Sequence, residues 1–174
     1  PDGFDARFSA LSRQYVYLIS DSGLLDPRAR GGVWVWRRGL DSESMHDAAQ
    51  PLIGEHDFAA FCKARPGASS VRTVLELGVE RRNDPRDPRL IEIAIRADAF
   101  CHSMVRSIVG ALLAVGEGRL DADELGGILQ AGQRVPRFTI APAHGLALVE
   151  VAYPPDQELA SQAQRARRFR GRST

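Results

Sequence analysis

The feature that most constrains this chain is an apolar stretch, residues 97–118, that carries an arginine in its middle. Apolar side chains recur nearly all round its helical projection, which predicts a buried helix capped by Asp98. Arg106 cannot give up its charge, so in a buried helix it needs an anion. His102 lies one turn before Arg106 on the same side, and Gly110, one turn after it, is expected to leave open space. The sequence leaves open whether the anion is a protein carboxylate or a ligand phosphate.

The composition is that of an ordinary globular chain. Its 174 residues are enough for one domain with a real core, and 44% of them are hydrophobic. No apolar run is long enough to span a membrane, and no secretory signal pattern occurs. The two cysteines, Cys62 and Cys101, have neither metal-site spacing nor the density of a disulfide framework. We therefore expect a cytoplasmic protein with reduced thiols, no metal site and no membrane association. Lys63 is the single lysine among 23 basic residues; the arginine bias fits a GC-rich genome or, alternatively, contacts with phosphate and planar bases.

Periodicity predicts the other elements. Strands are expected at 13–20, 33–37, 71–82, 90–96 and 146–151, with Ile91, Ile93 and Ile95 on one face of the fourth. Helices are expected at 41–52, capped by Asp41 or Ser42, and at 121–130, where Asp121 and Glu124 form a capping box. Residues 54–61 are expected to form a turn and a short apolar helix. Strict alternation in 71–82 is expected to place Leu75 on the same face as Leu77 and Val79. Hairpins with helices packed on one face predict an α+β fold with a mainly antiparallel sheet.

Two further patterns bear on binding. Arg13, Tyr15 and Tyr17 fall on one face of the first strand, where two tyrosines form an aromatic platform or are simply half-buried in the sheet. The chain divides into a folded part, 1–155, and a basic tail, 156–174, which is a solvated helix, a frayed end or a phosphate-contacting arm. The arginines of this tail are Arg165, Arg167, Arg168, Arg170 and Arg172.

Three segments together resemble the tRNA pseudouridine synthase A family. They are F-D-A-R-F-S-A with R-Q-Y-V-Y (4–10 and 13–17), F-C-H-S-M-V-R-S-I-V-G (100–110) and H-G-L-A-L-V (144–149). The resemblance covers the chain up to about Pro155 and implies part of a pseudouridine synthase-like catalytic domain, its C-terminal portion. That family isomerises uridines at positions 38 to 40 in the anticodon arm of tRNA.

The resemblance also implies roles for the matched residues. Tyr15 resembles the active-site tyrosine that stacks on the target base and assists removal of its C5 proton. Arg106 resembles the arginine that pairs with the catalytic aspartate, and Leu146 the apolar wall of the pocket. The other substrate-binding candidates are Arg7, Arg13, Tyr17 and His102.

One part of the family pattern is absent. The nucleophilic aspartate of the family lies in a G-R-T-D-A-G-V-H-like motif, which does not occur here. We expect it upstream of Pro1, so that this fragment is inactive alone whereas the full-length protein is a cofactor-independent isomerase of tRNA and, by resemblance, a homodimer. Two alternatives stay open: a non-catalytic RNA-binding or assembly module, and a small-ligand or regulatory domain in which Arg106 forms a structural ion pair.

Overall fold

The computed structural model describes residues 1–23, 27–29, 31–83, 87 and 89–167. Its centre is a six-stranded sheet with the order β2-β1-β5-β4-β3, in which β6 also pairs with β1. All pairs are antiparallel except β1 with β2. The strands are β1 (Ser12–Ser20), β2 (Trp34–Val35), β3 (Gly54–Asp57), β4 (Val71–Arg81), β5 (Leu90–Ala97) and β6 (Leu146–Ala152). The expected α+β fold is confirmed.

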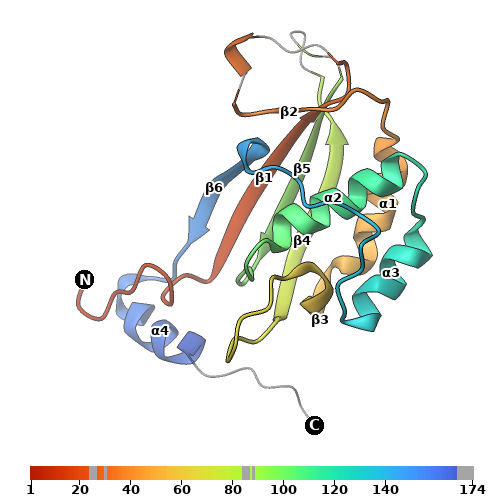
Figure 1. Cartoon of the computed structure of the whole chain (residues 1–174). Coiled ribbons are helices and arrows are strands. Elements are labelled where there is room, and N and C mark those ends of the chain that lie inside the picture. Colours follow the sequence, from red (N-terminus) through yellow and green to blue (C-terminus); the bar gives the residue numbers. More distant parts are fainter. Residues whose placement is uncertain (24–26, 30, 84–86, 88, 168–174) are drawn as a thin grey trace.

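The α-helices are α1 (Ser42–Ala49), α2 (Met104–Gly116), α3 (Ala122–Ala131) and α4 (Leu159–Arg167). Helices α1, α2 and α3 lie on one side of the sheet, whereas α4 lies apart from them beside the N-terminal segment (Figure 1). In α2 nearly every side chain is buried, as its apolar sequence predicts. The alternating isoleucines of β5, which are Ile91, Ile93 and Ile95, point into the same core. Within the described part of the chain, every helix is too short or too polar to cross a membrane.

Local sequence explains where two helices begin. Asp41 caps α1 by accepting hydrogen bonds from the backbone N–H groups of Glu43 and Ser44. Asp121 and Glu124 form the reciprocal capping box predicted for α3, each side chain accepting from the other's backbone N–H. Both helix starts are therefore specified within a few residues.

The prediction for 54–61 was wrong in its first half. Residues Gly54–Asp57 form β3, which pairs with the beginning of β4, and a single 3₁₀ turn, Ala59–Phe61, follows. Backbone groups at the edge of β4 give this segment hydrogen-bond partners that its own sequence does not reveal. The apolar Phe58 and Phe61 are fully buried.

Strict alternation in β4 was also a wrong prediction. The register against β5 shifts between Val74 and Glu76, which is a β-bulge. Val74 is consequently buried, whereas Leu75 is 47% exposed; Leu77 and Val79 return to the core.

The largest correction concerns the start of α2, which begins at Met104 and not after Asp98. Asp98 is no helix cap: its side chain accepts the N–H of Thr73 at 3.0 Å, and its own N–H donates to the carbonyl of Thr73. Because of these two hydrogen bonds, the chain continues along β4 beyond the end of β5 before α2 begins. Ser103, at the N-cap position of α2, adopts a left-handed conformation with φ of 68°.

A buried carboxylate joins three segments at the far end of β1. The Asp21 side chain is inaccessible to solvent and binds the guanidinium groups of Arg81 and Arg89 at 3.1 and 3.0 Å. It also accepts the Leu40 N–H at 2.8 Å. Burial raises the pKa of Asp21, but the hydrogen bonds from Arg81, Leu40 and Arg89 outweigh it and leave the pKa below its usual value.

Part of the basic tail is folded. Helix α4 packs against the N-terminal segment, with Leu159 and Ala163 buried and the Ser9 hydroxyl donating to the Leu159 carbonyl. Arg167 forms an ion pair with Asp5 at 2.9 Å. Three of the tail arginines, Arg168, Arg170 and Arg172, lie outside the described residues, so the phosphate-arm hypothesis is untested.

Candidate functional site

Tyr15 lies on β1 and packs against the hydrophobic core. It is partly buried, and its ring meets that of Phe100 edge to face, with centroids 5.2 Å apart. Leu148, its cross-strand neighbour on β6, is 52% exposed. Tyr15 and Leu148 share one face of the sheet because directly paired residues of an antiparallel sheet point the same way. Phe100 and Leu148 were not singled out from the sequence, although both lie in the motifs that carry the resemblance.

Tyr17 lies deeper on the same face and is inaccessible to solvent. Its hydroxyl donates to the Pro142 carbonyl at 2.8 Å. Burial raises the pKa of Tyr17 well above its ordinary value, and the nearby positive charge of Arg106 opposes this only in part. Tyr17 is therefore a protonated core residue in this structure, and its burial does not support direct contact with a substrate.

Arg106 projects from the first turns of α2 and is partly buried. Its Nε donates to the Ala141 carbonyl at 2.5 Å, while its own carbonyl accepts the Ala141 N–H at 3.0 Å. Among the residues that the structure describes, no carboxylate forms an ion pair with Arg106. One edge of the guanidinium is thus fixed by the backbone.

The open space expected beside Gly110 does not exist. A Cβ atom at Gly110 would lie 1.8 Å from the carbonyl oxygen of Thr139, so the segment 139–142 packs directly against the backbone of α2. At Gly145 a Cβ atom would come within 2.7 Å of the Tyr17 ring. These two glycines let the segment approach α2 and β1 closely before it enters β6 at the partly buried Leu146.

His102 and Arg106 do not share a helical face, because His102 precedes the helix. His102 is exposed, and its Nδ1 lies 3.1 Å from the Ser103 hydroxyl. Arg7 is exposed as well, with its guanidinium 5.1 Å from the centre of the Phe8 ring.

Arg13 has a different environment. Its guanidinium donates to two backbone carbonyls, that of Asp98 at 2.8 Å and that of Arg7. Arg13 thereby joins the segment before β1 to the segment after β5. Its charge is directed at the protein backbone, so a positioning role fits it better than a phosphate contact.

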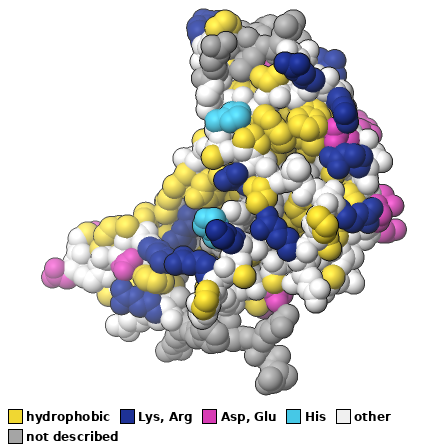
Figure 2. All heavy atoms as spheres, viewed as in Figure 1, with side chains coloured by type: hydrophobic (Ala, Val, Ile, Leu, Met, Phe, Trp, Pro, Cys, Tyr) yellow, Lys and Arg dark blue, Asp and Glu magenta, His cyan; other side chains and the backbone are white. Residues whose placement is uncertain are grey.

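Figure 2 shows this face of the molecule. Lys and Arg side chains gather around the beginnings of β1 and α2, and acidic side chains lie mainly toward the rims. Of the described residues, no three His, Cys, Asp or Glu side chains are grouped as a metal site would require. A partly buried aromatic ring, apolar neighbours and surrounding cations suit a polyanion that carries a flat base.

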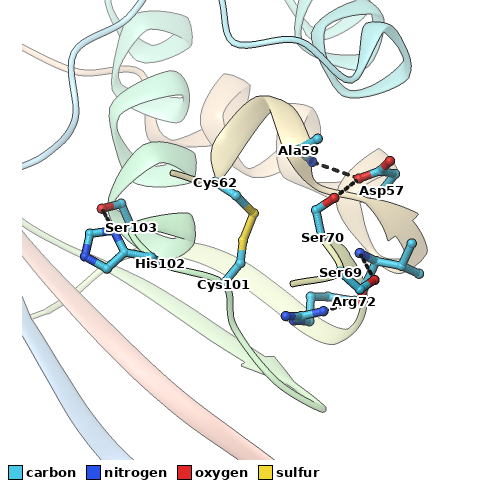
Figure 3. The surroundings of a disulfide bond; sticks show 10 residues. Asp57, Ala59, Cys62, Ser69, Ser70, Arg72, Cys101, His102 and Ser103 are labelled. Carbon is cyan, nitrogen blue, oxygen red and sulfur yellow. Dashed lines mark hydrogen bonds between the residues drawn. A yellow bond between two sulfur atoms is a disulfide. The ribbon is translucent and has the colours of Figure 1, made fainter. Parts of the chain in front are cut away.

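The cysteines are paired, which corrects the expectation of reduced thiols. Cys62 and Cys101 form a disulfide with Cα atoms 5.7 Å apart (Figure 3). It ties the 3₁₀ turn after β3 to the segment that bears Phe100 and His102. The sequence shows two cysteines 39 residues apart and gives no sign of their proximity.

Comparison with known proteins agrees with this geometry. Residues 48–154 match the family model described as tRNA pseudouridine synthase. The chain belongs to the tRNA pseudouridine synthase A family. Proteins named tRNA pseudouridine synthase A are 55% identical over 172 residues in Frankia casuarinae, 46% over 171 in Streptomyces avermitilis and 48% over 168 in Cutibacterium acnes.

The chain spans only part of these family members. The alignments cover 98%, 98% and 96% of this chain but 61%, 59% and 60% of the respective relatives. About two fifths of each relative therefore has no counterpart in this sequence. The assignment of individual site residues rests on the geometry above and on the resemblance of their motifs.

Proposed function

We propose that the protein to which this chain belongs isomerises uridine to pseudouridine at positions 38–40 in the anticodon arm of tRNA, with the target base held at Tyr15. Family membership, the partly buried Tyr15 and an Arg106 that lacks a carboxylate partner among the described residues carry this proposal. The reaction breaks the bond between N1 and C1′ of the uridine, turns the base and joins C5 to C1′. The C5 proton is released and N1 takes up a proton in its place, so the reaction balances with neither an electron transfer nor a cofactor.

The apolar surface around Tyr15 offers a stacking partner to a base that has left the RNA helix. A uracil ring that leaves the helix loses stacking, which an aromatic side chain replaces. Phe100 fixes the orientation of Tyr15 from the side, and Leu148 extends the apolar surface across β6. Leu146, paired with Tyr17 one step deeper, closes the pocket as its wall.

Arg106 provides the electrostatic part of the proposal. A carboxylate next to C1′ acts as nucleophile or base only when it is ionised and aimed. With its Nε held by Ala141, Arg106 presents the remaining N–H groups in a fixed direction. We propose that these groups bind the catalytic aspartate, which comes from the part of the enzyme that this sequence does not contain.

Exposed cations position the RNA around this pocket. Arg7 and His102 are both exposed and are proposed to contact phosphates or bases of the anticodon arm. Contacts of this kind place the target uridine without reading its sequence. We also propose a homodimer, which sedimentation at several concentrations of the full-length protein tests.

The test uses a joined protein, which consists of this chain and the segment of the Frankia casuarinae relative that it does not match. tRNA labelled with tritium at C5 of uridine reports the reaction by release of tritium into water. We expect release from the joined protein and none from the 174-residue chain alone. Release by the chain alone would show that the carboxylate argument is wrong.

Two variants of the joined protein separate the role of Arg106 from general effects of charge. Arg106→Met is expected to lower kcat at least about 100-fold, equivalent to about 2.7 kcal/mol of transition-state stabilisation. Arg82→Met, which removes an arginine paired with Glu92 on the sheet, serves as the matched control and should retain activity. Equal turnover by both variants contradicts the proposal, and tRNA binding without any tritium release favours a non-catalytic RNA-binding module.

A further inference from the structure

We propose that Cys62 and Cys101 form a reversible redox site that controls the segment next to Tyr15 and thereby the affinity of the enzyme for tRNA. The effect on tRNA affinity rests on the proposed function, whereas the redox site itself rests on the geometry of the two cysteines. The disulfide joins two segments that are otherwise held by hydrogen bonds and packing.

The Cys62 side of the disulfide is an anchor. The 3₁₀ turn that precedes it includes Phe61, which is fully buried. Asp57 accepts hydrogen bonds from the Ala59 N–H at 3.0 Å and from the Ser70 hydroxyl at 2.5 Å, which closes the turn (Figure 3). Cys62 itself is 7% exposed. The local structure therefore persists when the sulfur–sulfur bond is broken.

The segment on the Cys101 side of the disulfide is the one that is proposed to move when the redox state changes. Cys101 stands between Phe100, which contacts Tyr15, and the exposed His102. Ser103 follows in a left-handed conformation, which is costly for a residue with a side chain and persists only where surrounding contacts hold it. Figure 3 shows His102 and Ser103 directed away from the disulfide, on the side opposite Asp57 and Ser70.

Besides the disulfide, residues 101–103 are held by the backbone hydrogen bonds that their carbonyls accept. The Lys63 N–H donates to the His102 carbonyl at 2.9 Å, the Met104 N–H to the Cys101 carbonyl at 3.1 Å and the Ser107 N–H to the Ser103 carbonyl at 2.9 Å. Reduction removes the covalent restraint and leaves these bonds in place. The segment then has enough freedom for Ser103 to leave the left-handed region, and this shifts His102 and Phe100 relative to Tyr15.

The redox step is thiol–disulfide exchange with a low-molecular-weight disulfide such as oxidised glutathione. Cys101, the more accessible cysteine, attacks one sulfur as the thiolate and releases the first thiol. Cys62 then attacks the Cys101 sulfur, forms the intramolecular bond and releases the second thiol. Two protein thiols are oxidised and one small disulfide is reduced to two thiols; a dithiol reductant reverses the reaction.

The first experiment needs no enzyme activity. The 174-residue chain contains two cysteines, so after oxidised glutathione it should take up no alkylating reagent under denaturing conditions, and after dithiothreitol it should take up two equivalents. Hydrogen exchange of the backbone amides at 101–104 should be faster in the reduced form, with the amides of α3 as an internal control. Absence of the crosslink, or unchanged exchange at 101–104, overturns the inference.

The second experiment measures function in the joined protein. Reduction should weaken tRNA binding by about fivefold or more, the lower end of typical coupling between two sites. The Cys62→Ala/Cys101→Ala double variant, which lacks both thiols, should behave like the reduced protein and should not respond to either reagent. If binding is equal in both redox states, the regulatory inference is wrong even when tritium is released. If no tritium is released but exchange at 101–104 still responds, the proposed function fails and the redox site stands.

Discussion

Replacement of Gly110 by alanine tests how tightly the segment 139–142 is fixed against α2. A Cβ atom there would lie 1.8 Å from the Thr139 carbonyl oxygen, whereas carbon–oxygen contacts normally begin at about 3.3 Å. The segment must therefore retreat by about 1.5 Å. The contact involves backbone on both sides, so no side-chain rotation relieves it.

The expected cost follows from what the displacement breaks. Two hydrogen bonds join Arg106 to Ala141, and each contributes about 1 kcal/mol net. Overpacking adds about 1–3 kcal/mol, and the better helix propensity of alanine returns about 1 kcal/mol. Gly110→Ala should therefore lower the free energy of unfolding by about 3 kcal/mol, or Tm by about 6–12 °C for a chain of this size.

Gly126→Ala is the matched control, since Gly126 lies inside α3 and a methyl group added there would meet no atom within 4 Å. The same substitution should there raise the free energy of unfolding by up to about 1 kcal/mol. Thermal and urea unfolding of both variants and the parent chain measure the difference. A Gly110→Ala protein that melts within about 2 °C of the parent would refute the close packing of 139–142 on α2.

Three further predictions concern charge and stacking. The folded state keeps the pKa of Asp21 low, so its contribution to stability is complete above the unfolded pKa of about 4 and is lost as pH falls below it. Urea unfolding of Asp21→Asn between pH 5 and 3 should therefore show a weaker pH dependence than the parent; an equal slope contradicts the ion-pair account. Arg7→Gln should reduce the salt dependence of tRNA binding by about one unit of log–log slope, whereas Arg13→Lys should lower affinity with the slope unchanged, because Arg13 contacts backbone carbonyls. A lower slope in Arg13→Lys would assign it to phosphate. Tyr15→Ala should weaken binding of the anticodon arm by about 1–3 kcal/mol while Tyr15→Phe retains it, measured by filter binding; equal losses would exclude stacking.

Local patterns predicted those parts of the fold whose determinants lie within a few residues. The isoleucine alternation of β5 and the helix caps at Asp41 and Asp121 depend on neighbours in sequence, and all are present. The bulge at Val74 and Glu76 has no such signature, because it arises from the pairing of two strands.

The surroundings of the candidate site could not be predicted from the sequence, because they too depend on contacts between distant segments. Asp98 has the composition of a helix cap, but Thr73 of β4 offers it two backbone hydrogen bonds, and α2 starts six residues later. The pairing of Cys62 with Cys101 likewise depends on how β3, β5 and α2 meet. Motif resemblance singled out Tyr15 and Arg106 as candidate site residues, whereas the contacts around them could be described only from the structure.

The central claim is that the target uridine lies against Tyr15. Photocrosslinking tests it most directly, with tRNA that carries 5-iodouridine at positions 38, 39 and 40 bound to the joined protein. Mass spectrometry of the irradiated complex should identify Tyr15 in the crosslinked peptide, and Tyr15→Ala should abolish that crosslink. A crosslink confined to the opposite face of the sheet, which carries Gln14, Glu92 and Arg96, would contradict the account.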